Sequence, residues 1–245
     1  MMKTITLAAG LGSRLRPHTD TKPKCMVPFL GTPILQRQFS VFKRAGISER
    51  YLISGYKNEK IKAEGFFEYH NSHFDSTNMV YSLALARELF DGESPIIIAY
   101  GDIIFSDNVL SALLTTEGDF CVVADENWEP YWRQRMPDYW TDVESFQLNE
   151  EGFISSIGQK WETKKEVQAQ YIGLMKISPP FHKYMRDRLA EIEATPEFHN
   201  MYMTDFLQKL IVEGFNLTPV IVSSGWLEFD QPEDLRTEFE KFLNA

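Results

Sequence analysis

The sequence predicts an α/β protein built on a doubly wound, mixed and mostly parallel sheet, with a small α+β lobe in its second half. Two observations predict this class. Apolar strand-like segments alternate with helix-like segments over the first 100 residues, as they do in βαβ units. After Asp102 the alternation gives way to several short strand-like segments and then two helices, which is typical of an α+β arrangement.

The first half opens with a short strand at residues 3–8, which the glycine-rich segment after it cannot continue. Thr32 is predicted to cap a helix that has Pro33 at its first position and ends at Gly46. The next elements are expected to be a strand at 51–53, a charged helix from about 58, a helix at 78–89 and a strand at 95–99. The last of these is apolar without alternation, which suits a central parallel strand covered on both faces.

The second half is predicted to hold four strands, two helices, a further strand and a last helix. Their expected ranges are 120–124, 143–148, 154–157, 167–176, 180–193, 203–213, 218–222 and 232–243. An aromatic and polar insertion at 128–140 interrupts them. Since the sequence shows no long linker or internal repeat, we expect a single domain over 1–245, with halves at 1–118 and 119–245.

Composition narrows the function classes. A formal net charge of -10 excludes a broad electrostatic footprint for DNA or RNA, although a local basic pocket can still hold a phosphate. The only cysteines, Cys25 and Cys121, fit a reducing compartment. No apolar run approaches the roughly 20 residues that span a bilayer, and residues 2–9 do not resemble a signal peptide. We therefore expect a cytoplasmic protein that acts on small molecules rather than on nucleic acid or a membrane.

The most informative segment runs from Leu7 to Pro17 and is followed by Pro23-Lys24. Small residues after the first strand let the backbone turn sharply and direct N–H groups at anionic oxygens. Arg14 adds a planar donor fork and Lys24 a compact charge, so the segment suits a polyphosphate. The alternative is a tight turn with two solvated basic side chains. Neither the Gly-x-Gly-x-x-Gly pattern nor the Walker pattern is complete here.

The whole motif, Leu7-Ala8-Ala9-Gly10-Leu11-Gly12-Ser13-Arg14-Leu15-Arg16-Pro17 with Pro23-Lys24, resembles the signature of the nucleotidyltransferases that make nucleoside-diphosphate sugars and CDP-activated alcohols. The resemblance implies their Rossmann-like nucleotidyltransferase fold, with a nucleotide-binding half and an acceptor-binding half. It also implies that Arg14 stabilises the leaving pyrophosphate and that Lys24 contacts the phosphoryl group under attack. The expected nucleotide-binding residues are Leu7, Ala8, Ala9, Gly10, Gly12, Ser13, Tyr100 and Gly101.

Two later sites match the same family. Tyr100-Gly101-Asp102 ends the apolar strand, where the carboxyl end of an open sheet faces the ligand crevice. The segment 226–235 resembles the closing motif of the family, so Asp102 and Asp230 are the expected pair of Mg²⁺ ligands. Two carboxylates suit Mg²⁺, which takes its other ligands from phosphates and water. The alternatives are a turn-forming role for Asp102 and a helix N-cap for Asp230.

The compact chain and residues 76–83 look more like the CTP-using branch, which activates phosphocholine and related phosphates or phosphonates. Residues 128–145 and 170–174 most resemble phosphoglutamine cytidylyltransferases and, more loosely, aminoethylphosphonate ones. The acceptor pocket is therefore expected to use Asn78, Tyr81, Trp132, Asp142, Glu144 and Tyr171. Asn78 would equally serve as an N-cap, Tyr81 as half-buried packing, and the insertion as an aromatic mini-core with solvated charges.

The reaction expected from this resemblance is Mg²⁺-dependent transfer of CMP from CTP to a small phosphate or phosphonate, with release of pyrophosphate. The nearest alternative is a sugar-1-phosphate nucleotidyltransferase that uses UTP, dTTP or GTP. A non-catalytic nucleotide sensor is a third reading, which the full set of Arg14, Lys24, Asp102 and Asp230 disfavours. The oligomeric state stays open, with a homodimer as one candidate.

Overall fold

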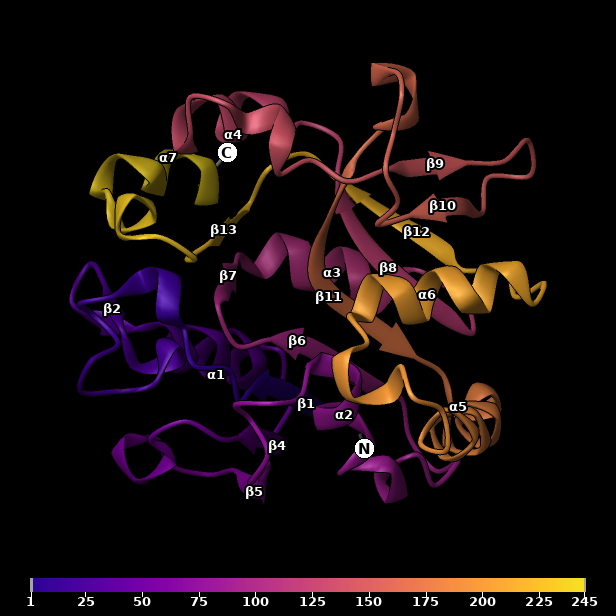
Figure 1. The fold of residues 1–245 in the computed structure, drawn as a ribbon, viewed down its shortest axis with the longest axis horizontal. Coiled ribbons are helices and arrows are strands. Elements are labelled where there is room, and N and C mark those ends of the chain that lie inside the picture. Colours follow the sequence, from indigo (N-terminus) through magenta and orange to yellow (C-terminus); the bar gives the residue numbers. More distant parts are fainter. Residues whose placement is uncertain (1, 245) are drawn as a thin grey trace.

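The computed structural model describes residues 2–244, and its centre is a seven-stranded sheet (Figure 1). The strand order is β12-β8-β11-β6-β1-β4-β5. Only β11 runs antiparallel to its neighbours, so the predicted mixed, mostly parallel sheet is confirmed. The strands are β1 (Lys3–Ala8), β4 (Glu49–Ser54), β5 (Phe67–His70), β6 (Ile96–Tyr100), β8 (Phe120–Asp125), β11 (Gln170–Ile177) and β12 (Thr218–Val222).

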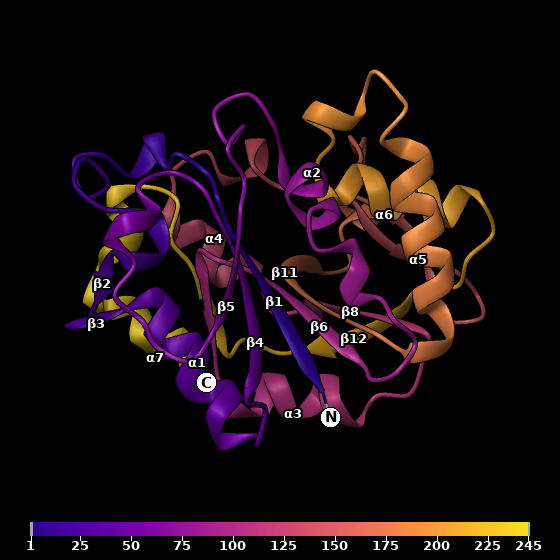
Figure 2. The same ribbon diagram turned by 90° about the horizontal axis from the view of Figure 1, so that it is seen from below.

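Helices cover both faces of this sheet (Figure 2). On one side lie α1 (Ile34–Arg44), α3 (Asp107–Thr115) and the C-terminal α7 (Glu240–Leu243); on the other lie α2 (Met79–Ala84), α5 (Pro179–Ile192) and α6 (Met203–Val212). Strand β6 is buried throughout Ile96–Ala99, and its alternate side chains join the two separate cores. This explains why its sequence is apolar without alternation.

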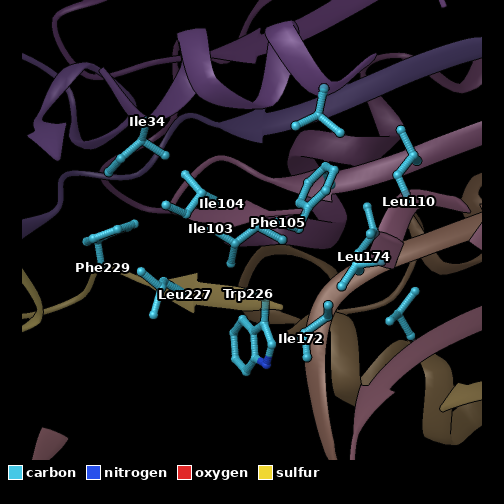
Figure 3. Packing of buried hydrophobic residues seen from close by; sticks show 14 of the residues in the cluster. Ile34, Ile103, Ile104, Phe105, Leu110, Ile172, Leu174, Trp226, Leu227 and Phe229 are labelled. Atoms are coloured by element: carbon cyan, nitrogen blue, oxygen red, sulfur yellow. The ribbon is translucent and has the colours of Figure 1, made fainter. Parts of the chain in front are cut away.

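Three small two-stranded sheets complete the architecture. β7 (Ile103–Phe105) pairs antiparallel with β13 (Trp226–Glu228), β2 (Pro28–Phe29) with β3 (Thr32–Pro33), and β9 (Phe146–Leu148) with β10 (Ile154–Ile157). The β7–β13 pair joins segments more than 100 residues apart and packs against α1 and β11 through apolar side chains such as Ile103, Leu227 and Ile172 (Figure 3). The β7 strand begins immediately after Asp102, and β13 ends two residues before Asp230.

Four predicted elements were wrong in detail. The helix expected at 78–89 ends as α2 at Ala84, and a separate 3₁₀ turn follows at Arg87–Leu89. The charged helix from residue 58 is only a 3₁₀ turn at Asn58–Lys60, followed by strand β5; with few apolar positions, such a helix has no face to bury. Thr32 does not cap α1, because Thr32 and Pro33 form β3. The last helix is divided into 3₁₀ turns at Pro232–Leu235 and Thr237–Phe239 and the short α7.

Within residues 2–244, every helix is too short or too polar to cross a membrane.

Candidate active site

A cavity of about 480 Å³ opens at the carboxyl ends of β1 and β6. This is the edge at which open α/β sheets bind ligands. Its walls combine the glycine-rich loop, the end of β6, the segment after β5 and residues from the C-terminal part. They are Leu7, Ala8, Ala9, Gly10, Leu11, Gly12, Ser13, Arg14, Lys24, Cys25, Asn71, Phe74, Thr77, Asn78, Met79, Ser82, Tyr100, Gly101, Asp102, Tyr202, Glu228 and Asp230.

Glycines set the shape of the loop and of the strand end facing it. Gly12 has a φ of +60°, and a Cβ there would lie 3.1 Å from the Cβ of Lys24, so glycine lets the lysine stem pass close to the loop. A Cβ on Gly101 would come within 2.6 Å of the Cβ of Ala8. Gly10, by contrast, has nothing within 4 Å of such a Cβ. The loop backbone is therefore open to a ligand at Gly10.

Lys24 joins the two aspartates that the sequence analysis paired. Its Nζ lies 2.7 Å from Oδ2 of Asp102 and 2.8 Å from Oδ1 of Asp230. The guanidinium of Arg14 lies 2.8 Å from the other oxygen of Asp230 and is 70% exposed. The structure thus brings two cations and two carboxylates together at one wall of the cavity, although the four residues are spread over more than 200 positions of the chain.

The ionic groups of this wall shift one another's pKa. Burial tends to lower the pKa of Lys24, but the charges of Asp102 and Asp230 outweigh it, and the pKa is raised. Burial tends to raise the pKa of Asp230, yet Lys24 and Arg14 hold it below its usual range. Glu228, the third carboxylate at the cavity, has a raised pKa because burial and its two acidic neighbours outweigh the charge of Arg135. The two cations therefore favour the charged form of Asp230, whereas burial and the neighbouring acids disfavour the charged form of Glu228.

Backbone pairing holds the aspartates in place. Asp102 lies in the turn between β6 and β7, and Phe229 N–H donates to the Asp102 carbonyl at 3.0 Å, which extends the β7–β13 ladder toward Asp230. The fully buried Gln38 on α1 donates its amide to the carbonyls of Tyr100 and Ile103, both at 2.6 Å. Gln38 thus fixes the turn from both sides. Neither Gln38 nor this register carried a signal that sequence reasoning recognised.

The opposite wall comes from residues 71–82 and the turn before α6. Asn71, which is 1% exposed, donates its amide to Thr77 Oγ1 and Ser82 Oγ, both at 3.0 Å. Asn78 caps α2 through a 2.9 Å bond from Met79 N–H, and its own N–H donates to the His199 carbonyl at 2.7 Å. Asn78 therefore both caps a helix and lines the cavity, so its two predicted roles are compatible.

Several predicted acceptor residues lie elsewhere. Among the described residues, the cavity walls do not include Tyr81, Trp132, Asp142, Glu144 or Tyr171. Tyr81 packs on Phe198 and His199, and Trp132 is 4% exposed in an aromatic cluster, as the packing alternatives predicted. Their large apolar surfaces are already buried against other rings.

Tyr171 touches the edge of Tyr100, a wall residue, with ring centroids 5.7 Å apart. Asp142 and Glu144 are exposed on the connection before β9. Although much of the Glu144 side chain is exposed, desolvation of its carboxyl group by the surrounding protein and the charges of Asp142 and Asp205 raise its pKa. Direct contact of any of these side chains with an acceptor stays a prediction.

Sequence reasoning missed Glu228 and Tyr202 as wall residues. Glu228 stands two residues before Asp230, a spacing that places both carboxylates at one end of β13, and this pattern was present in the sequence. Tyr202 precedes α6 and is 58% exposed. An isolated exposed tyrosine gives no such signal.

The donor set suits one hard cation together with phosphates. Oδ1 of Asp102 is buried and has no hydrogen-bond partner, so an oxygen ligand is free there. Within residues 2–244, no group of three or more His, Cys, Asp or Glu side chains is arranged to hold a metal ion. A Mg²⁺ ion commonly uses one or two carboxylates and completes its shell with phosphate oxygens and water. Asp102 and Asp230 are the residues that would hold it.

Comparisons with known proteins show the family and the fold of this chain. Residues 4–195 match the model of the MobA-like NTP transferase domain. The CTP:phosphoglutamine cytidylyltransferase of Campylobacter jejuni is 33% identical, covering 98% of this chain and 100% of that protein. The structure of CTP:phosphocholine cytidylyltransferase from Streptococcus pneumoniae has a TM-score of 0.75 at 19% identity and covers 99% of this chain and 98% of that one.

The inositol-1-phosphate CTP transferase from T. maritima shares the fold as well, with a TM-score of 0.76 at 18% identity over 100% of this chain and 95% of that one. The resemblance that the glycine-rich motif carried is therefore confirmed at the level of family and fold. The chain belongs to the family of the MobA-like NTP transferase domain, and it is a nucleotidyltransferase.

Proposed function

We propose that this nucleotidyltransferase is a cytidylyltransferase that transfers CMP from CTP to a small phosphate or phosphonate acceptor. The observation that carries the proposal is the wall at which Lys24 and Arg14 meet Asp102 and Asp230 beside the open glycine loop. The preference for CTP rests on the phosphoglutamine enzyme that is 33% identical over nearly the whole chain.

In the proposed reaction, an oxygen of the acceptor phosphate attacks the α-phosphorus of CTP. A new P–O bond forms, the bond from the α-phosphorus to the oxygen bridging to the β-phosphorus breaks, and pyrophosphate leaves with that electron pair. The acceptor phosphate is already ionised near neutral pH, so no general base is required. The main obstacle to the reaction is electrostatic repulsion between the two anionic substrates. Preorganised cationic groups reduce this repulsion.

Each wall residue then has a defined task. Lys24 and Arg14 balance the charges of the two aspartates. When the polyphosphate binds, they exchange these partners for phosphate oxygens. Lys24 is 15% exposed and held from two sides, so it suits the group under attack. Arg14, mostly exposed, suits the pyrophosphate that departs. Mg²⁺, bound by Asp102 and Asp230, would supply charge neutralisation for both phosphate groups.

The acceptor is proposed to bind across the wall formed by Asn71, Asn78 and Tyr202, which faces the glycine loop in the same cavity. The Asn78 carboxamide and the Tyr202 hydroxyl can donate to a phosphate or carboxylate, and the tyrosine ring can contact an ammonium group. Asn71, whose two amide hydrogens are bound to Thr77 and Ser82, supports this wall from behind. An amino-bearing acceptor of the phosphoglutamine, phosphocholine or aminoethylphosphonate type suits these groups.

Pyrophosphate release tests the proposal. The purified protein is incubated with Mg²⁺, one of CTP, UTP, GTP, ATP or dTTP, and one of phosphocholine, aminoethylphosphonate, phosphoglutamine or glucose 1-phosphate. We expect release with CTP and one of the first three acceptors. Preference for glucose 1-phosphate with UTP, dTTP or GTP would instead support the sugar-1-phosphate alternative. Nucleotide binding without release under any combination would indicate a sensor.

A further inference from the structure

Arg135, the last residue of α4 (Glu129–Arg135), is a buried arginine whose side chain is 2% exposed. Its guanidinium binds Asp234 through two bonds, Nε to Oδ1 at 2.9 Å and Nη2 to Oδ2 at 3.0 Å. Its remaining nitrogen, Nη1, binds Oε2 of Glu228 at 2.7 Å. One side chain from the aromatic insertion therefore contacts two carboxylates on either side of Asp230.

Asp234 transmits this contact to the backbone of Asp230. Its Oδ2 accepts the N–H of Asp230 at 2.8 Å and the N–H of Gln231 at 2.9 Å. Asp234 is itself 2% exposed. The Arg135 guanidinium binds both carboxylate oxygens of Asp234 and so fixes the orientation of that carboxylate. The Asp234 carboxylate in turn holds the backbone of Asp230, which sets the direction of the Asp230 side chain.

The neighbouring turn of α4 contacts the same strand. Tyr131 Oη donates to the Glu228 carbonyl and accepts from the Glu228 N–H, both at 3.1 Å. The Arg135 guanidinium lies over the rings of Tyr131 and Trp132, at 5.4 and 5.0 Å from their centroids. Through these contacts, helix α4 of the aromatic insertion is attached to the strand that leads to Asp230.

A buried ion pair is a poor source of net stability, because desolvation offsets most of its Coulomb energy, and well-packed apolar residues often replace it without loss. A geometric role is therefore the stronger account of Arg135. Glu228 and Asp230 both line the cavity, and both are positioned through this one guanidinium.

We propose that Arg135 is a positioning residue that, with Asp234, fixes the orientation of Asp230 and Glu228 toward the bound cation and polyphosphate. The expected effect of Arg135 on turnover rests on the proposed function. Its structural claim, that cation affinity at Asp230 depends on Arg135, can be measured without turnover.

The test compares Arg135→Lys, Arg135→Met and Asp234→Asn with the wild-type protein. Arg135→Lys keeps the positive charge but lacks the planar guanidinium that binds both Asp234 oxygens, and this variant carries the test if Arg135→Met does not fold. Arg188→Met is the matched control, since Arg188 on α5 pairs with Glu191 and Glu213 away from the cavity. Electron paramagnetic resonance measures Mn²⁺ binding in the presence of CTP without acceptor. Pyrophosphate release gives kcat and the acceptor KM, and circular dichroism checks the fold.

We expect folded Arg135→Lys and Asp234→Asn to bind Mn²⁺ at least tenfold more weakly and to lose at least tenfold in kcat, with the acceptor KM changed less than threefold. Arg188→Met should keep wild-type Mn²⁺ affinity even where its melting temperature falls. Mn²⁺ affinity within threefold of wild type in the Arg135 variants would overturn the inference. Wild-type protein that binds Mn²⁺ but releases no pyrophosphate would instead count against the proposed function alone.

Discussion

Replacing Lys24 with methionine removes the ammonium group between Asp102 and Asp230 while keeping most of the apolar stem. Because Nζ is 2.7 and 2.8 Å from these carboxylates, the variant leaves two like charges facing each other, with only Arg14 still bound to Asp230. Loss of one preorganised charged donor at such a site typically costs on the order of 10²–10³ in kcat, or about 3–4 kcal/mol of transition-state stabilisation. We expect a loss of that size.

The same substitution should also destabilise the unliganded fold. Removing one partner of a fully buried ion pair costs about 3–5 kcal/mol. Here the three side chains keep 12 to 20% of their exposure and solvent screens them, so we expect about 1–3 kcal/mol after that discount. A protein of this size loses roughly 2–4 °C of melting temperature per kcal/mol.

The pH dependence of this loss has a defined sign. Lys24 lowers the pKa of Asp230 in the folded state, so the pair contributes stability above the unfolded pKa of about 3.9 and loses it as the pH falls through the folded pKa. The difference in melting temperature between wild type and Lys24→Met should therefore be largest near neutral pH and shrink below about pH 4.

The assay is pyrophosphate release at saturating CTP and acceptor, together with thermal melts from pH 3 to 8. Lys22→Met is the control, because it makes the same change two residues away at a side chain outside the cavity walls. Turnover of Lys24→Met within threefold of wild type would refute the assigned role. A stability difference that does not depend on pH would refute the electrostatic account.

Three further predictions concern other parts of the chain. Arg14→Met should lower kcat at least tenfold in the pyrophosphate assay, since it removes a charged donor, with little change in melting temperature. The control Arg44→Met, which removes an exposed ion pair with Asp107, should leave kcat unchanged. Equal effects of the two substitutions on kcat would contradict the role assigned to Arg14. Gly101→Val should lower the free energy of unfolding by about 1–3 kcal/mol, because its Cβ would lie 2.6 Å from that of Ala8. An unchanged melting temperature would contradict this packing. His182 is fully buried and its pKa is lowered by burial. The stability that neutral His182 contributes is therefore present above the unfolded pKa of about 6.5 and is lost as the pH falls below that value. In His182→Gln, the melting temperature should depend less on pH between pH 5 and 7, and an unchanged pH dependence would reject the burial effect.

The parts of the fold that the sequence predicted share a local cause. Helices α5 and α6 have apolar positions whose spacing within a few residues sets which face is buried, and β6 is a continuous apolar run of the kind that both faces of a central strand require. The elements it missed, such as β7, β13 and the short helix α3, are three to nine residues long. Such short segments are stabilised by partners distant in the chain, so their own sequences carry little periodicity.

The sequence by itself determined the glycine-rich loop, its two basic residues and hence the family, because a backbone turn and its flanking charges depend on consecutive residues. It also named Asp102 and Asp230 as a pair. Only the tertiary structure decided that Lys24 lies between them, that Glu228 and Tyr202 join the cavity, and that Arg135 turns inward to Asp234 while Trp132 is packed in the core. These contacts follow from the register of β7 on β13 and from how large side chains fill the space behind it, and neither leaves a pattern in any one stretch of the chain.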